Sequence, residues 1–374
     1  MCYYALVMRT GIIGLASVGK TSLFKILTHA QLDAKAAHAP VHVGVAHVPD
    51  PRLEKLAELY KPKKITHANI EYVDVGGLVK DRTKDAQFLA QLREVDALAH
   101  VVRLFENPTV PHPPGSLDAR RDIESVELEL MLNDLEQITR RITRLEHDLR
   151  KKKDPAQEHE LALLTRCKQS IEAEKPLREL ELLSDEQKLL NSFGFLSRRP
   201  MLNLLNISDN EAAEVENAVE KHGLAALAAK PHTAMVAFCG KIEAELGELE
   251  DAEAAELMSV YELKESALDR ILHATYRLLG LISFFTCGDP ECRAWTIERG
   301  TTALKAAGAI HSDIERGFIK AEVVRWDDLI EAGSLARARE AGKVKLEGKE
   351  YVVEDGEVIL FRHSGRKKSE SVEV

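Results

Sequence analysis

The segment Gly14-Leu-Ala-Ser-Val-Gly-Lys-Thr21 follows the apolar run Thr10–Ile13 and precedes Ser22-Leu-Phe-Lys-Ile-Leu27. It matches the pattern G-x4-G-K-[ST] in the strand–loop–helix context that a phosphate-binding loop (P-loop) requires. Glycine lets consecutive backbone N–H groups turn towards phosphate oxygens, and the helix that follows directs its positive end at the same anion. We therefore predict nucleotide binding here; the alternative is a plain glycine-rich turn before a core helix.

Two side chains of this loop are expected to carry the chemistry. Lys20 reaches the β- and γ-phosphates in such loops, and Thr21 offers its hydroxyl to Mg²⁺. Mg²⁺ is therefore the expected cofactor. The loop residues predicted to bind the nucleotide are Gly14, Ala16, Ser17, Val18, Gly19, Lys20, Thr21 and Ser22.

The composition indicates a globular protein of two or three domains. Of its 374 residues, 45% are hydrophobic and 30% are charged. We find no apolar run long enough for a membrane span and no signal-peptide pattern, and five cysteines lack paired spacing. We therefore expect a cytoplasmic protein that contacts no membrane. The net charge of −10 argues against broad nucleic-acid binding, and hence against DNA, although local patches can bind RNA.

Short β-branched runs alternate with helical stretches in the first third of the chain, and the strands resume near residue 200. Such alternation predicts an α/β fold with a parallel-rich sheet and right-handed crossovers. The strands are predicted at 9–14, 43–48, 69–74, 97–104, 200–207 and 233–240, and the first helices at 21–30 and 88–95.

Between the two sets of strands, apolar residues from Val126 to Leu149 repeat at close to every 3.5 residues, which is typical of a coiled-coil seam. Lys151-Lys-Lys-Asp-Pro-Ala156 is a polar break, and a second helical stretch follows it. We predict an antiparallel helical hairpin over about 122–184, inserted into the nucleotide domain. The alternative is a simple helical subdomain with a solvated basic tip.

From Ile282 the sequence becomes rich in strand patterns, with a helix opening at Gly300 and a hairpin predicted around Gly348. This order suggests a small β-grasp-like module. The predicted domains are the two parts of the nucleotide domain (1–121 and 198–281), the inserted hairpin (122–197), the β-grasp-like domain (282–363) and a disordered charged tail (364–374).

Two further motifs follow predicted strands. Asp74-Val-Gly-Gly77 matches D-x-x-G, in which Asp74 holds Mg²⁺ through water and the Gly77 N–H senses the γ-phosphate. Asn206-Ile-Ser-Asp209 occupies the base-reading position, where GTPases carry N-K-x-D; Asp209 would accept guanine N–H groups, but Ile207 replaces the lysine. A strand-ending turn is the alternative reading. Cys239 and Gly240, at the end of the last strand, complete the predicted base site.

These motifs resemble the YchF/Obg-like ATPase family of translation-factor-related P-loop GTPases. The resemblance covers nearly the whole chain and includes the blocks His100–Asn107, Leu278–Thr286 and Gly308–Glu322. It implies ATP in preference to GTP, slow hydrolysis, binding to the ribosome and its RNA, and a role in translation or stress regulation. It also implies that the C-terminal module is a TGS domain.

The resemblance further implies a catalytic set of Lys20, Gly77 and His112. Leu78 stands where other GTPases carry the switch-II glutamine, and His112 matches the family's proposed substitute, whose imidazole would orient or deprotonate the attacking water. The alternative is a solvent-exposed histidine in a proline-rich loop.

The chain departs from the family pattern at several points. Ala16-Ser17 replaces Pro-Asn in the P-loop, and His38 aligns with the switch-I threonine. Two alternatives therefore stay open: a GTP-binding switch, and a hydrolysis-deficient nucleotide-binding scaffold on the ribosome. Zinc binding by His38, His42 and His47 is disfavoured, because they lack cysteine or carboxylate partners at suitable spacing.

Overall fold

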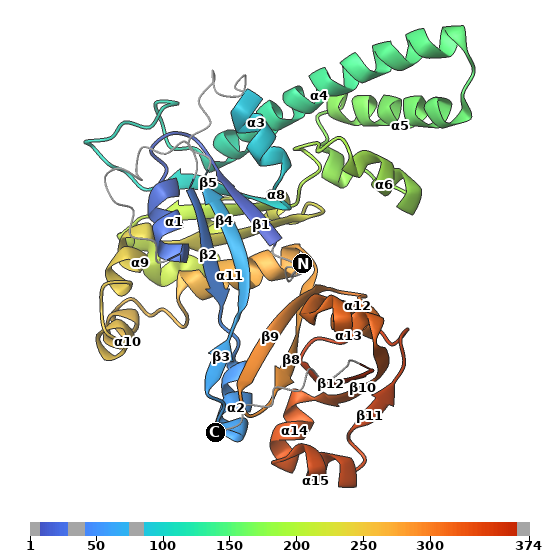
Figure 1. The fold of residues 1–374 in the computed structure, drawn as a ribbon. Coiled ribbons are helices and arrows are strands. Elements are labelled where there is room, and N and C mark those ends of the chain that lie inside the picture. The colour runs from blue at the N-terminus through green and yellow to red at the C-terminus, as the bar shows by residue number, and fades with distance from the viewer. Residues whose placement is uncertain (1–7, 29–41, 75–85, 365–374) are drawn as a thin grey trace. The chain divides into compact units, whose positions relative to one another are not determined.

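The computed structural model describes residues 8–28, 42–74 and 86–364. Its contacts divide the chain into two compact units (Figure 1). The P-loop unit contains residues 9–46 and 71–278, and the C-terminal unit contains residues 1–8, 47–70 and 279–374. No helix within the described ranges is both long and apolar enough to cross a membrane.

The main sheet has the strand order β2-β4-β1-β5-β6-β7. β1 pairs in parallel with β5, β5 with β6 and β6 with β7. β5 and β6 are buried along almost their whole length, as expected for strands that are covered on both faces. The predicted α/β fold and all six predicted strands of this sheet are confirmed. The strands are β1 (Met8–Ile13), β2 (His42–Val48), β4 (Ala68–Asp74), β5 (Ala97–Leu104), β6 (Met201–Ile207) and β7 (Thr233–Phe238).

Helices connect these strands. The first follows the P-loop directly, and several shorter helices lie between β6 and the C-terminal unit. They are α1 (Lys20–Thr28), α3 (Ala86–Arg93), η4 (Asp209–Asn217), α7 (Ala218–Lys221), α8 (Ala225–Ala228), α9 (Gly240–Leu246), α10 (Asp251–Val260) and α11 (Ala267–Leu278).

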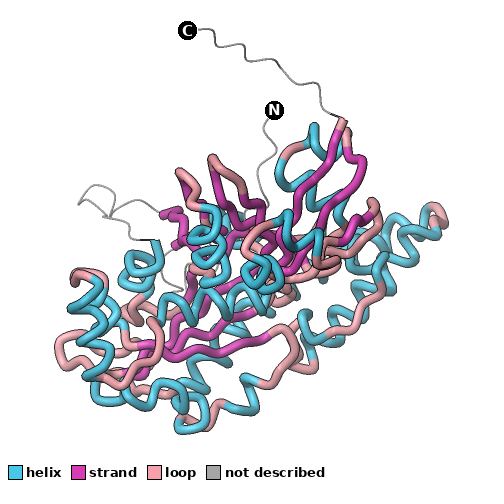
Figure 2. The backbone as a smooth tube through the Cα atoms, turned by 90° about the horizontal axis from the view of Figure 1, so that it is seen from below, coloured by secondary structure: helices cyan, strands magenta, loops and turns pink. Residues whose placement is uncertain are grey.

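The predicted hairpin consists of α4 (Ala119–Lys151) and α5 (Pro155–Glu172), which lie side by side (Figure 1, Figure 2). Asp154 caps α5, and Pro155 begins it, which explains why the chain reverses here. The second arm is shorter than predicted. After Glu172 the chain forms the short helix η3 (Leu177–Glu179) and then α6 (Ser184–Asn191).

The C-terminal unit contains a second sheet with the order β11-β10-β12-β8-β9-β3. β8 and β9 are antiparallel, β12 is parallel to β8, and β10 is antiparallel to β12. Helix α12 (Ala303–Ile310) contributes to the core that this sheet buries. The strands are β3 (Lys64–Thr66), β8 (Leu281–Cys287), β9 (Glu291–Glu298), β10 (Phe318–Arg325), β11 (Lys345–Glu347) and β12 (Glu357–His363); α13 (Ser312–Arg316), α14 (Trp326–Ala332) and α15 (Leu335–Glu340) complete the unit.

The predicted hairpin around Gly348 is wrong. β11 pairs with β10 instead, with Leu346 opposite Glu322. The backbone after Gly348 is used elsewhere, because the carbonyl oxygens of Lys349 and Tyr351 accept hydrogen bonds from the first residues of α12. The segment that suggested a second hairpin strand therefore provides backbone acceptors for the N–H groups at the start of α12.

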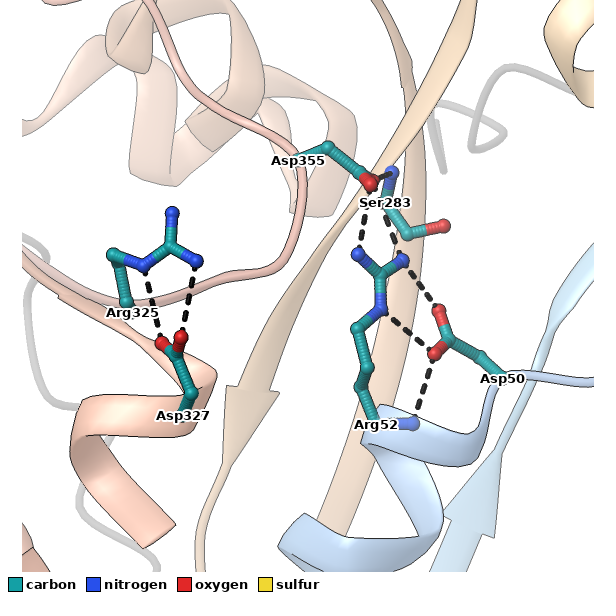
Figure 3. A network of polar contacts seen from close by, with 6 residues as sticks. All are labelled: Asp50, Arg52, Ser283, Arg325, Asp327 and Asp355. Carbon is teal, nitrogen blue, oxygen red and sulfur yellow. Dashed lines mark hydrogen bonds and ion pairs between the residues drawn. The ribbon is translucent and has the colours of Figure 1, made fainter. Parts of the chain in front are cut away.

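Residues 47–70 lie with the C-terminal unit, although the sequence led us to place them in the nucleotide domain. This segment contains α2 (Pro51–Tyr60), and β3 pairs with β9. At the start of α2, Arg52 donates to Asp50 over 2.8 Å and to Asp355 over 2.7 Å (Figure 3). Asp355 also accepts the backbone N–H of Ser283, so one carboxylate joins α2 to β8.

Candidate nucleotide-binding site

The P-loop lies between β1 and α1 and has the backbone that its glycines permit. Gly14 and Gly19 have φ of 143° and 101°. A Cβ atom at Gly14 would lie 2.5 Å from the carbonyl oxygen of Val101, and one at Gly19 would lie 2.5 Å from the Asn206 side chain. Both positions therefore require glycine for conformation and for space. Ser17 also has a positive φ, of 60°.

Lys20 is folded into this loop. Its Nζ donates to the carbonyl oxygens of Leu15, over 2.5 Å, and Gly14, over 3.2 Å, and the residue is only 7% exposed. These carbonyls hold the ammonium group at the anion-binding turn. A phosphate oxygen can replace these carbonyl oxygens as the acceptor. Because the phosphate is anionic, its hydrogen bond with the ammonium group is stronger than that of a neutral carbonyl.

Thr21 and Asp74, the two predicted Mg²⁺ ligands, lie together. The Thr21 Oγ1 is 3.1 Å from Oδ2 of Asp74, which is buried at the end of β4. A hydroxyl and a carboxylate are hard oxygen donors that suit Mg²⁺, which takes one or two protein ligands and fills its shell with water and phosphate. In the described ranges no group of three or more His, Cys, Asp and Glu could hold a metal, so a closed protein cage is absent there.

Other predicted residues fall outside the described ranges. They are Gly77, Leu78 and His38, together with residues 75–76 and 79–85. The predicted γ-phosphate sensor and the switch-I position therefore stay predictions.

Asn206 ties the P-loop to the opposite wall of the site. Its Nδ2 donates to the carbonyl of Val18 over 3.0 Å, and its Oδ1 accepts the N–H of Gly240 over 3.1 Å. A cavity of about 520 Å³ opens beside it, within the range of small-ligand sites. Its lining includes the predicted residues Gly19, Ser22, Asn206, Ile207, Asp209, Cys239 and Gly240, and also Phe105, Glu106, Asn107 and Lys241.

Lys241 is a residue that the sequence reasoning missed. Its Nζ lies 2.5 Å from Oδ2 of Asp209, and this hydrogen bond holds the pKa of Asp209 below its usual value. Ile207 is 2% exposed and belongs to the hydrophobic core, so it presents little side-chain surface to a base. The carboxylate that would read guanine therefore already has a cationic partner.

His112 is buried, which excludes the solvent-exposed alternative. Its Nε2 lies 2.6 Å from Oδ2 of Asp122 in the first turn of α4, and the imidazole is 4% exposed. The other carboxylate oxygen of Asp122 accepts two hydrogen bonds from Arg121. Asp122 was missed because its pairing with His112 depends on how the loop folds back onto the helix.

Arg103, also missed, connects the P-loop with the loop that carries His112. It is 2% exposed near the end of β5 and donates to the carbonyl oxygens of Phe105 and Val110 over 2.9 and 3.0 Å. A third bond of 3.4 Å reaches the carbonyl of Ser17. The one feature of the sequence that could have indicated Arg103 is the presence of an arginine within a largely apolar strand.

Comparisons with known proteins cover nearly the whole chain. A family model described as a 50S ribosome-binding GTPase matches residues 9–156, and a YchF GTPase C-terminal model, described as a protein of unknown function, matches residues 281–364. The ribosome-binding ATPase YchF of Bacillus subtilis is 42% identical over 364 residues, which cover 95% of this chain and 99% of that protein. The chain belongs to the YchF family.

Other YchF proteins extend the comparison. The ribosome-binding ATPase YchF of Haemophilus ducreyi is 39% identical over 95% of this chain and 98% of its own length. The solved YchF GTPase of Schizosaccharomyces pombe is 29% identical, with a TM-score of 0.82 over 97% of this chain and 100% of that one. The family resemblance inferred from the motifs is thereby confirmed.

Proposed function

We propose that this chain is an Mg²⁺-dependent ATPase that binds ATP at its P-loop and hydrolyses it slowly. The observation that carries the proposal is the contact between Thr21 and Asp74, beside the lysine held in the loop. YchF relatives that match nearly the full chain are named ribosome-binding ATPases. Membership in that family supports the same activity here.

In this mechanism, Lys20 and the loop N–H groups bind phosphate, and Thr21 and Asp74 bind the metal ion. Lys20 exchanges loop carbonyls for phosphate oxygens, and the loop N–H groups hold the same oxygens as charge develops on them. Thr21 and Asp74 are the residues that would hold Mg²⁺, with Asp74 acting through water as its D-x-x-G motif predicts. When bound, the ion neutralises phosphate charge.

We assign the orientation of the attacking water to His112. We assign the hydrogen of the neutral imidazole to Nε2, where Asp122 accepts it, so that the lone pair lies on Nδ1. Nδ1 is buried and has no hydrogen-bond partner among the described residues. It is thus the atom of this imidazole that is left to accept a proton or orient water once it is uncovered.

Metal dependence tests the centre of the proposal. Single-turnover hydrolysis of ATP should vanish on chelation of Mg²⁺ and return on its addition. Asp74→Asn should need more Mg²⁺ for half-maximal rate, with Asp148→Asn on the hairpin as the control. A rate that does not respond to Mg²⁺ contradicts the mechanism.

We propose ATP rather than GTP because Lys241 occupies the carboxylate of Asp209 and Ile207 is buried. Guanine would have to displace Lys241 to gain its contacts. Competition between ATP and GTP for a fluorescent analogue decides the point. Tighter binding of GTP by more than about tenfold, or ~1.4 kcal/mol, would establish the GTP switch instead.

We also propose that the partner is the ribosome, including its RNA, and that the protein acts in the cytoplasm in translation or stress regulation. The hairpin offers a basic tip at Arg150–Lys153, which is exposed. The C-terminal unit has the strand order of a β-grasp module, which supports the TGS assignment. Co-sedimentation with ribosomes in the presence of ATP tests this proposal. We expect the protein to co-sediment, and we expect binding to be lost when the basic residues of the tip are replaced by glutamine.

The hydrolysis-deficient scaffold is favoured by one observation, the histidine at position 38 in place of the switch-I threonine. Such a scaffold would bind ribosomes in an ATP-dependent way without turnover. Wild-type protein that binds ATP but hydrolyses none, alone or with ribosomes, would establish it.

A further inference from the structure

We propose that the P-loop unit has a second ligand site, a basic pocket that binds a small organic anion with an apolar portion. The pocket lies where β5, β6 and β7 begin, whereas the nucleotide site follows the ends of β1, β4 and β6. Its volume is about 440 Å³, which suits a small molecule. The basic residues in its lining are Arg178, Arg198, Arg199 and His232.

Arg198 and Arg199 bring positive charge into the pocket, and no ion-pair partner for either lies among the described residues. Both are half-buried. Arg198 donates to Oδ1 of Asn191 and Arg199 to the carbonyl of Arg93, each over 2.7 Å, and both acceptors are neutral. Within the described ranges neither guanidinium forms an ion pair, and Asp96 and Asp134 act on Arg199 only from a distance.

The environment makes these charges costly. Burial lowers the pKa of both guanidinium groups, and Arg199 lowers that of Arg198 further. The one carboxylate in the lining, Asp96, already accepts the backbone N–H of Arg9 over 2.8 Å. An uncompensated cation at a partly buried position is unfavourable, so a bound anion would stabilise this arrangement.

The walls of the pocket are held in place by buried contacts. Arg178, with a side chain 2% exposed, is ion-paired with Glu127, and its Nη1 donates to the carbonyl of Ser197. His232, also in the lining, has a positive φ of 51°, and its carbonyl accepts the N–H of Met201 at the start of β6. A strained backbone held by the sheet fits a preorganised site.

The lining also contains the polar side chains Gln187 and Asn191 and several apolar ones, and the apolar ones narrow the class of ligand. Leu180, Leu182, Leu190 and Phe195 line the pocket. Inorganic phosphate would neutralise the arginines but leave this surface uncovered. An anion that also carries an aliphatic or aromatic group satisfies both parts, with its carboxylate, sulfonate or phosphate at Arg198 and Arg199.

A pair of dyes that differ in charge tests the site. Anilinonaphthalene sulfonate carries the anion and the aromatic part, and phenylnaphthylamine is its neutral counterpart. We expect one saturable sulfonate site that saturating Mg²⁺ and ATP leave in place. Arg198→Gln with Arg199→Gln should weaken sulfonate binding by roughly tenfold or more, the cost of losing charge-assisted hydrogen bonds.

The controls separate charge recognition from general stickiness. The neutral dye should bind wild-type protein and the double variant equally, and Arg140→Gln, whose side chain is 72% exposed on α4, should leave sulfonate affinity unchanged. Thermal unfolding of the double variant and of each single variant checks that they fold; we expect no loss of melting temperature, because unpaired charges are removed. Unchanged sulfonate affinity in the folded double variant, or its displacement by ATP, overturns the proposal. Neither result bears on ATP hydrolysis.

Discussion

The guanidinium of Arg103 lies 3.4 Å from the carbonyl oxygen of Ser17, so a buried side chain of β5 is hydrogen-bonded to the P-loop. The same group holds the carbonyl oxygens of Phe105 and Val110 and lies 4.6 Å from the centre of the Phe105 ring. Phe105 lines the nucleotide cavity, and Val110 is two residues before His112. One cation therefore positions three parts of the site.

We expect Arg103→Lys to lower the single-turnover rate of ATP hydrolysis by roughly tenfold or more, because lysine keeps the charge but cannot serve three acceptors from a planar fork. ATP affinity should change less than the rate. Nucleotide titration and rapid-quench hydrolysis measure the two. Arg150→Lys, which is exposed, is the matched control. If Arg103→Lys is less stable but hydrolyses ATP at the wild-type rate, Arg103 has only a structural role.

Lys20→Ala should weaken ATP binding on the order of a hundredfold, about 3 kcal/mol, because it removes the one ammonium group that the loop holds. The fold should persist, since the Nζ hydrogen bonds of Lys20 to the carbonyls of Gly14 and Leu15 stay within the loop itself. Titration with a fluorescent ATP analogue measures the affinity. Lys25→Ala, exposed on the same helix, should bind as wild type does. Equal affinities in both variants would contradict the P-loop assignment.

Asp134 provides a prediction about pH. It is buried in α4 and accepts hydrogen bonds from the N–H groups of Leu196 and Ser197, over 2.9 and 2.7 Å, and burial raises its pKa to about 6. Because the folded state binds this proton more tightly than the unfolded state, the contribution of Asp134 to stability is greatest below about pH 4 and declines as pH rises through 6.

The corresponding measurement is urea unfolding between pH 4 and 7. The decline attributable to Asp134 should be about 1–3 kcal/mol and should disappear in Asp134→Asn. That variant should also be less stable at every pH, since its amide places N–H groups against N–H donors. Glu136→Gln, exposed on the same helix, should keep the wild-type slope. An equal slope in Asp134→Asn would show that Asp134 does not titrate in this range.

Short-range patterns were sufficient to predict much of the fold. The largely apolar runs that form β5 and β6 are continuous and buried, and the P-loop has its chemistry within Gly14–Thr21. Pro155 marked the reversal between α4 and α5. In each case the residues that decide the local structure are adjacent in sequence.

Pairings over long sequence separations could not be predicted in this way. Arg52 meets Asp355 across 303 positions, and β3 pairs with β9, so contacts distant in sequence hold residues 47–70 in the C-terminal unit. Asp209 meets Lys241 across 32 positions, so the carboxylate of the predicted base-reading motif has a cationic partner that the sequence did not indicate. Gly348 suggested a hairpin because its neighbours are strand-like, yet their carbonyls hold α12.

The buried pair of His112 and Asp122 gives the last prediction. His112→Ala should lower the single-turnover rate by on the order of a hundredfold with little change in ATP affinity, because it removes the proposed water-orienting group. Asp122→Asn should also slow hydrolysis, since an amide can donate to Nε2 and shift the hydrogen to Nδ1. His147→Ala, whose side chain is 63% exposed, is the control for the first variant. If His112→Ala hydrolyses ATP at the wild-type rate, the imidazole is only a packing element beneath the loop, and the water must be oriented by another group.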